Sequence, residues 1–213
     1  VAGGIRHSAC QAYLYDQPGK SNLEILLETR CTSVEFSGKD AVRVHLTRRG
    51  EVFHIDVGEE VILSAGAIQS PQLLMLSGIG DADMLMKNDI ALTEHVPGVG
   101  ENLQDRPAWC FDYGATNPRD SLASQLGYVG RLKVGLDWLL RKQGLGISNH
   151  FEVGAFLCLL EDEAVPDVQL ECIAMRGDFA PKGISLEPGY QCFASLQRPT
   201  SRGKLWIDGA DPA

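Results

Sequence analysis

The chain has 213 residues, of which 44% are hydrophobic, so it is long enough to bury a core and to form one or two domains. Its 28 acidic residues outnumber its 19 basic residues, which gives a net charge of −9 at pH 7. This charge favours solubility and would repel a phosphate backbone, and the basic residues gather in no patch. We therefore exclude nucleic acid as a partner.

The six cysteines are scattered through the chain and form no Cys-x-x-Cys pair. Several lie in apolar stretches, which favours buried free thiols in a reducing compartment and argues against a metal site. No apolar run reaches the roughly 18 residues that a transmembrane helix requires. We therefore expect no transmembrane segment and a cytoplasmic location, with association to a membrane surface left open.

The first sixty residues predict a short helix followed by a small antiparallel sheet. Residues 8–15 resemble a helix that ends at a turn containing Pro18 and Gly19. Four apolar or alternating segments then predict the strands of a meander: residues 23–27, 31–36, 41–48 and 51–57.

The run 61–80, VILSAGAIQSPQLLMLSGIG, predicts a strand, a turn and a helix. Residues 61–63 suit a strand buried on both faces. Ser70 and Pro71 are typical of a helix start, as N-cap and first helical residue, and the glycines at 78 and 80 are typical of its end. Residues 64–67 carry little side-chain bulk, so geometry alone leaves open an ordinary connection or a turn that contacts a cofactor.

The remaining elements alternate helices and strands up to the end of the chain. We expect a helix over residues 81–88 and a strand over 91–95, then a strand over 108–113 and a long helix over 121–142. That helix carries apolar residues along one side: Leu122, Val129, Leu132, Leu136, Leu139 and Leu140. Four further strands are predicted over residues 153–160, 167–174, 190–197 and 203–208. The pattern predicts an α+β fold with an antiparallel sheet covered by helices.

Several separated motifs resemble one enzyme family, in the family's order. The run 61–80 resembles a signature segment of the glucose-methanol-choline (GMC) oxidoreductases, and residues 96–105, VPGVGENLQD, resemble the proline- and glycine-rich loop of that family. Residues 149–156, NHFEVGAF, resemble a segment typical of the choline dehydrogenase-like branch, and residues 199–205 resemble the strand entry after it. The resemblance covers essentially the whole chain.

Enzymes of this family oxidise alcohols with FAD, so the resemblance implies an alcohol oxidoreductase with FAD as its cofactor and a small alcohol as its substrate. It implies that residues 1–107 are part of an FAD-binding α/β domain that includes the meander. Residues 108–213 would form most of a substrate-binding domain. Neither the alcohol nor the electron acceptor, whether oxygen, a quinone or another compound, follows from the sequence.

Two parts of the family pattern are absent from the sequence. The Gly-x-Gly-x-x-Gly turn that holds the FAD pyrophosphate does not occur, and the nearest match, Gly98-Val99-Gly100, lacks the third glycine. The family's catalytic histidine lies in a C-terminal segment that has no counterpart here. We therefore predict a middle fragment that contains no catalytic residue, holds FAD weakly or not at all and is inactive by itself. The rest of the same enzyme would then be its partner.

The resemblance implies four cofactor-binding positions, namely Cys31, Ser64, Ala65 and Gly66. Cys31 stands where the family commonly has valine and where the backbone faces the adenine of FAD. A main-chain contact tolerates this replacement, although a core thiol is the alternative interpretation. Ala65 and its neighbours would pack beside the adenosine half of FAD, because they lack bulk.

Three neighbouring residues are the candidates for substrate binding. Glu152 lies between Phe151 and an apolar stretch, where a carboxylate is costly unless it is paired. In choline-oxidising relatives the matching glutamate can attract a quaternary ammonium group, which a carboxylate beside aromatic walls suits. The alternative is a strand whose Glu152 faces solvent. His150 would line the same pocket, or it is an ordinary surface or core histidine.

Two other classes of function remain open from the sequence. The chain could be a stand-alone module that binds an onium ion or an alcohol without flavin, or a structural remnant with neither activity. A hydrolase is not supported, because Gly-x-Ser-x-Gly is absent. Arg106 departs from the histidine that many relatives carry after the aspartate of the glycine-rich loop, so no contact is inferred there. Oligomeric state is not predicted.

Overall fold

The computed structural model describes residues 3–14, 20–160, 164–180 and 183–212, and of residues 152, 178–180 and 183–184 it describes the backbone alone. The chain forms two compact units. One unit, here called the sheet unit, contains Val1–Lys20 and Arg106–Pro199, and the other, called the core unit, contains Ser21–Asp105 and Thr200–Ala213.

The chain passes between the units at three points, whereas the sequence suggested a single boundary between residues 107 and 108. Each of the two crossings that the sequence did not suggest is explained by a hydrogen bond between residues far apart in the chain. Trp138 donates its indole N–H to the carbonyl of Gly4, at 3.0 Å, which ties the N-terminal segment to the sheet unit. Leu205 donates its backbone N–H to Gly100 at 2.7 Å, which ties the C-terminal segment to the core unit. The predicted FAD-binding and substrate-binding roles of the two parts stay predictions.

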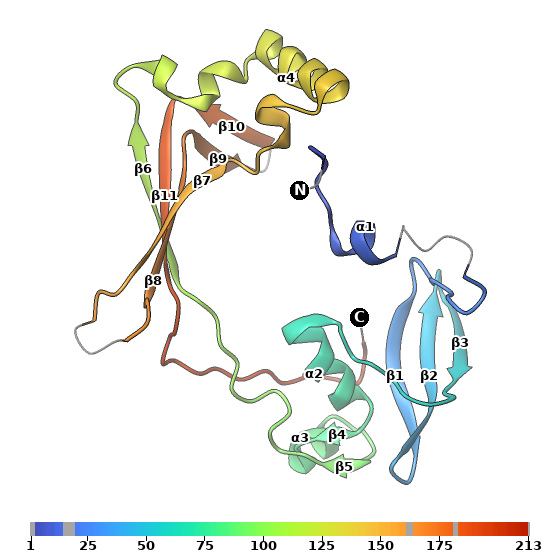
Figure 1. The fold of residues 1–213 in the computed structure, drawn as a ribbon. Helices are drawn as coiled ribbons and strands as arrows, with labels where there is room; N and C mark the ends of the chain where they lie inside the picture. The colour runs from blue at the N-terminus through green and yellow to red at the C-terminus, as the bar shows by residue number, and fades with distance from the viewer. Residues whose placement is uncertain (1–2, 15–19, 161–163, 181–182, 213) are drawn as a thin grey trace. The chain divides into compact units, whose positions relative to one another are not determined.

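The core unit begins with the predicted meander, in the order β1-β2-β3 (Figure 1). Strands β1 (Arg30–Ser37), β2 (Asp40–Arg48) and β3 (Glu51–Asp56) pair antiparallel through tight turns at Gly38 and Gly50, both with positive φ. Helix α2 (Gly66–Leu76) packs beside β1, and the hydroxyl of Ser77 connects them. It accepts the Val34 N–H at 2.8 Å and donates to Leu73 O at 2.6 Å.

The rest of the core unit surrounds a small apolar centre. Helix α3 (Ala82–Lys87) is N-capped by Asp81, and β4 (Ile79–Gly80) pairs in parallel with β5 (Glu94–His95). Met75 and Leu85 are fully buried and pack with Ile207. Gly100, at φ +86, must be glycine, because a Cβ there would meet the carbonyl of Leu205.

The sheet unit is built on a four-stranded antiparallel sheet in the order β6-β11-β8-β7. Its strands are β6 (Ala108–Gly114), β7 (Phe151–Leu157), β8 (Val168–Ile173) and β11 (Gly189–Leu196). A hairpin of β9 (Arg176–Ala180) and β10 (Gly183–Glu187) joins the sheet through Gln191. The buried amide of Gln191 exchanges two hydrogen bonds of 3.2 Å with the backbone of Gly177.

Short helices complete the sheet unit. They are α1 (Ala9–Tyr13), the 3-10 turns η1 (Pro118–Asp120), η2 (Leu122–Gln125) and η3 (Gly144–Ile147), and α4 (Tyr128–Arg141). Helix α4 is amphipathic as predicted, but none of its residues is buried, and its apolar side is exposed. The predicted start at residue 121 is wrong, because residues 122–125 form η2 and α4 begins at Tyr128. The helix ends at Arg141, one residue before the predicted bound, because Lys142 adopts a left-handed conformation.

The α+β class is confirmed, and most elements lie where the sequence predicts them. Three predicted strands are wrong: residues 23–27, 61–63 and 203–208 form no strand. The described residues supply no ladder for them, and Ile62, expected to be buried, is 76% exposed. The predicted start of α2 is also wrong, since the helix begins at Gly66 and includes Pro71. The hairpin β9-β10 was not predicted.

Candidate functional site

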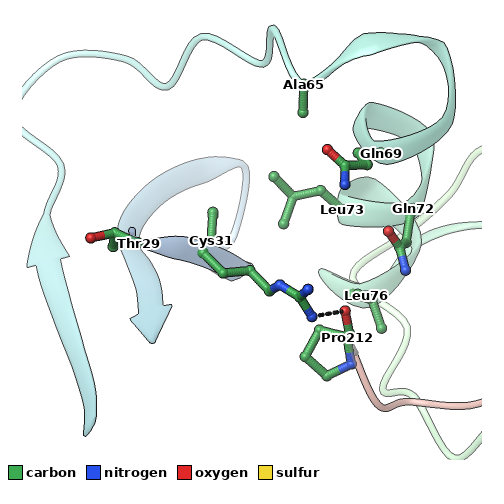
Figure 2. Close-up of a pocket in the computed structure, with 9 residues that line it drawn as sticks. Thr29, Cys31, Ala65, Gln69, Gln72, Leu73, Leu76 and Pro212 are labelled. Atoms are coloured by element: carbon green, nitrogen blue, oxygen red, sulfur yellow. Dashed lines mark hydrogen bonds between the residues drawn. The ribbon is translucent and has the colours of Figure 1, made fainter. Parts of the chain in front are cut away.

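The core unit contains a cavity of about 530 Å³ between the start of β1 and one side of α2 (Figure 2). Leu73 and Leu76 form its apolar surface, and the side-chain amides of Gln69 and Gln72 lie beside them on the same helix. The remaining lining residues are Thr29, Arg30, Cys31, Ala65 and Pro212. An apolar surface with amide groups at its edge can accept a flat heteroaromatic ring that also carries hydrogen-bonding atoms.

The small residues at the start of α2 leave one side of the cavity free of bulky side chains. The N-cap residue Ala65 contributes only a methyl group, and Gly66 follows with φ +91. Ser70 Oγ accepts the backbone N–H of Ala65 at 3.1 Å, which satisfies a donor that the helix start leaves unpaired. Ser70 therefore stabilises the helix start from inside the first turns, and not as the N-cap.

Two neighbouring residues of β1, Cys31 and Arg30, determine the charge at this cavity. Burial raises the pKa of the Cys31 thiol, against a weaker opposing effect of its contact with Ser33 O, so this side chain is neutral at physiological pH. The guanidinium of Arg30 donates to Pro212 O at 2.8 Å, and a dashed line at the labelled Pro212 marks this bond in Figure 2. The cavity thus presents a neutral thiol and a positive group already engaged with a carbonyl.

The structure brings two of the four predicted cofactor residues together. Cys31 and Ala65 line the same cavity, although 34 positions separate them in sequence. Ser64 and Gly66 flank Ala65 but do not line the cavity. Sequence reasoning missed Gln69 and Gln72, although their i, i+3 spacing places both on one side of a helix. The misplaced helix start concealed this signal, because Gln69 precedes Ser70, the predicted N-cap.

The sheet unit contains a second cavity, also of about 530 Å³, beside β8 and β11. His150 lines it together with Asp120, Cys172 and Tyr190, among others. His150 adopts a left-handed backbone conformation, φ +67, which is uncommon for a residue with a side chain. Its Nδ1 atom is buried and finds no hydrogen-bond partner within the described part of the chain.

The other two predicted substrate residues lie next to His150 at the start of β7. Phe151 is 42% exposed and packs its ring 5.9 Å from that of Phe193, and it does not line the cavity. The backbone of Glu152 coincides with a register shift in the pairing of β7 with β8. The side chain of Glu152 lies outside the described residues, so its predicted contacts are not addressed by the structure.

Other kinds of site are not found in the described ranges. No group of three or more His, Cys, Asp or Glu side chains is arranged to hold a metal ion there. No helix in that part of the chain has both the length and the apolar character needed to cross a bilayer. Arg106 donates to Gln197 Oε1 at 2.9 Å within the sheet unit.

Comparisons with known proteins agree with this architecture. A family model described as GMC oxidoreductase matches residues 1–108. An oxygen-dependent choline dehydrogenase of Photobacterium profundum is 37% identical over 212 residues, which are 100% of this chain and 37% of that protein.

Solved structures show the same fold at lower identity. A formate oxidase matches with a TM-score of 0.81 and 23% identity, over 92% of this chain and 39% of the oxidase. An FAD-dependent oxidoreductase of Chaetomium thermophilum matches with a TM-score of 0.74 and 20% identity, over 90% of this chain and 40% of that enzyme. The chain therefore spans well under half the length of these relatives. Because the family model covers more than half of its residues, the chain belongs to the GMC oxidoreductase family.

Proposed function

We propose that this chain is part of an FAD-dependent alcohol oxidoreductase of the choline-oxidising type, which transfers a hydride from an alcohol carbon to the flavin. The observation that carries the proposal is the cavity between β1 and α2, which lies almost wholly within the residues that the family model matches. Relatives named as a choline dehydrogenase and an FAD-dependent oxidoreductase support the reaction class.

The residues of this cavity fit the adenine half of FAD. Leu73 and Leu76 offer an apolar surface to a ring face, and the amides of Gln69 and Gln72 offer donors and acceptors to a ring edge. The neutral thiol of Cys31 adds no charge beside an uncharged base. The volume of about 530 Å³ is within the range of small-molecule sites.

When bound, FAD supplies the hydride acceptor for alcohol oxidation. In our proposal this chain contributes binding and orientation: α2 and β1 hold the adenine through Cys31, Ala65 and the two glutamines. Ser64 and Gly66 keep the start of α2 free of bulk. None of these residues moves a proton, and the catalytic base belongs to another part of the enzyme.

We place substrate binding in the sheet unit, at the cavity beside His150. The rings of Tyr113 and Tyr190 stack with centroids 4.8 Å apart, and Tyr190 lines that cavity together with the carboxylate of Asp120. Aromatic faces and carboxylates attract a quaternary ammonium ion, which supports an onium alcohol as substrate. We assign substrate binding to His150, which lines this cavity, and to its neighbours Phe151 and Glu152 at the start of β7, of which Phe151 does not line it.

The adenine assignment is tested by binding to the 213-residue chain. Purified chain is titrated with FAD, AMP and riboflavin, and binding is followed by flavin fluorescence and by competition. We expect weak, saturable binding of FAD that AMP displaces, and no binding of riboflavin, which lacks adenine. Ala65→Leu should weaken FAD binding about tenfold or more, because the larger side chain occupies the cavity.

The matched control is Ala91→Leu, which enlarges another exposed alanine of the core unit that lines no described cavity near β1. It should leave FAD affinity unchanged. Riboflavin binding as strong as FAD binding, equal loss in both variants, or no FAD binding at all would each reject the adenine site.

We further propose that the chain by itself has no alcohol-oxidising turnover. With choline, added FAD and an artificial electron acceptor, the assay should give no betaine aldehyde. Turnover above the protein-free rate would contradict the proposal. Choline binding that persists in the absence of flavin, measured by calorimetry, would favour a stand-alone binding module.

A further inference from the structure

Two cysteines of the sheet unit lie directly opposite each other on neighbouring strands. Cys172 of β8 pairs with Cys192 of β11 in the antiparallel register, and their Sγ atoms are 3.0 Å apart (Figure 1 shows the two strands). Both are free thiols and both are partly buried. No role in cofactor or substrate binding has been assigned to this pair.

The register provides the geometry of a cross-strand disulfide. Directly opposed residues of an antiparallel pair have Cα atoms about 4.5–5.5 Å apart, which falls within the span of about 4.4–6.8 Å that a disulfide bridges. Such residues also project their side chains to the same face of the sheet. The sulfurs therefore need to approach by only about 1 Å to reach bonding distance, without a change of register.

The third cysteine of this sheet is a poor competitor. Cys110 of β6 pairs with Phe193, whereas Cys192 pairs with Phe111. Because successive residues of a strand point to opposite faces, Cys110 and Cys192 project to different sides of the sheet. The register thus selects Cys172 as the partner of Cys192.

The pair is accessible to a small oxidant. Cys172 lines the cavity of about 530 Å³ beside His150. The residues next to the pair on the same face are Phe111 and Val153, which are 46% and 66% exposed. A molecule as small as a peroxide can therefore reach the sulfurs from the cavity side.

We propose that Cys172 and Cys192 are an oxidation site, at which hydrogen peroxide or a comparable hydroperoxide converts the two thiols into a reversible cross-strand disulfide. The thiolate of Cys172 attacks one peroxide oxygen, the O–O bond breaks with loss of hydroxide, and a sulfenic acid forms. The sulfur of Cys192 then attacks the sulfur of Cys172, the S–O bond breaks and water leaves. The two thiols lose two electrons, and the peroxide is reduced to two molecules of water.

The position of the sulfurs determines which one reacts first. Cys172 lines the cavity and is therefore the attacking thiol, whereas Cys192 does not line it and is the resolving thiol. The hydrogen bond with Cys172 raises the pKa of Cys192 to about 11, and desolvation adds to this effect, which agrees with this assignment. The bond would link β8 to β11 at the wall of the cavity that contains His150.

The test uses the 213-residue chain, reduced, desalted and exposed to a small excess of hydrogen peroxide at pH 8. We expect the chain to lose two of its six free thiols, its mass to fall by about 2 Da, and dithiothreitol to restore both. Trypsin should release peptides 143–176 and 183–202 as one linked species. Fragmentation should assign the link to Cys172, with Cys158 carrying the alkylating label.

Matched cysteine variants complete the test. Cys172→Ser and Cys192→Ser should each abolish the linked species, and Cys110→Ser should leave its rate and yield unchanged. A link between Cys110 and Cys192, a disulfide between two chains, or oxidation to sulfinic acid without a link would overturn the proposal. Because the linked peptide is measured in the unsubstituted chain, failure of a variant to fold does not affect the result.

Discussion

The two units of this chain bury different kinds of side chain. In the described residues, the buried hydrophobic side chains all belong to the core unit: Val34, Leu46, Leu73, Met75, Leu85 and Ile207. The buried polar and charged side chains, apart from Ser77, all belong to the sheet unit: Ser121, Asp167 and Gln191. One unit is therefore organised around an apolar centre and the other around buried hydrogen bonds.

The two units therefore depend on different interactions for their stability. Apolar burial contributes in proportion to the area removed from water, so the core unit should respond most to loss of side-chain volume. The sheet unit exposes much of its apolar surface, including Trp109 and Phe156, and positions its loops by polar side chains. It should respond most to loss of a single donor or acceptor, because an unpaired buried polar group is costly.

The largest expected effect comes from truncating the apolar centre. Met75→Ala removes a fully buried side chain, and we expect it to destabilise the core unit by about 2–5 kcal/mol. Hydrogen exchange, read separately for α2 and α3 and for the strands of the sheet unit, measures the change. Met86→Ala is the matched control, since Met86 is 70% exposed, and it should cost far less. Equal losses in the two variants would contradict an apolar core at this position.

A smaller effect is expected from a buried hydroxyl of the sheet unit. Ser121 is 1% exposed, and its Oγ lies 2.9 Å from Ala174 O and 3.1 Å from Gly189 O. Ser121→Ala removes this hydroxyl, while Ala174 O keeps the backbone N–H of Leu122 at 2.7 Å, and the loss should cost about 1–3 kcal/mol. Urea unfolding followed by exchange in β8 and β11 gives the value. The exposed Ser185 provides the control, because Ser185→Ala should hardly change the free energy of unfolding. If Ser121→Ala also left the free energy of unfolding unchanged, the contrast between the two units would be contradicted.

The smallest effect is a dependence of the stability of the sheet unit on pH. The buried carboxylate of Asp167 accepts the backbone N–H groups of Leu159 and Leu160, at 2.7 and 3.1 Å. The bond from Leu159 is the main reason that the pKa of Asp167 is below its ordinary value. The folded unit therefore binds this proton more weakly than the unfolded chain does. Its contribution is complete above about pH 4 and is lost as the pH falls further.

Asp167→Asn should remove this acid-dependent part of the stability, measured as the unfolding midpoint of the sheet unit between pH 2 and pH 7. Asp83→Asn, at an exposed position in the first turn of α3, is the matched control and should keep the dependence of the parent chain. An unchanged acid profile in Asp167→Asn would show that another carboxylate is responsible.

Much of the fold could be predicted because local signals and tertiary packing agree. The strands of the meander are separated by turns at Gly38 and Gly50, and the helix predicted over residues 81–88 forms there, with Asp81 as its N-cap. The motifs at residues 61–80 and 96–105 indicate the family from the sequence alone, and the family match confirms it. These features depend on residues that are close in sequence.

The errors occur where an element depends on distant residues. Residues 61–63 have the composition of a buried strand, but a strand requires a hydrogen-bonded neighbour, and the described residues supply none. Pro71 indicated a helix start, yet Ser70 pairs with Ala65 and the helix begins before the proline. The hairpin β9-β10 depends on Gln191 reaching Gly177, a contact that no local pattern predicts.

The sequence by itself determined the α+β class, the family and two of the residues that meet at the cavity between β1 and α2. Composition, turn residues and motif order are sufficient for those conclusions because each is a local property. Only the tertiary structure decided that Gln69 and Gln72 join Cys31, that Nδ1 of His150 has no partner among the described residues, and that Cys172 faces Cys192. Strand register and helix start place these side chains, and both are set by backbone hydrogen bonds between segments far apart in the chain.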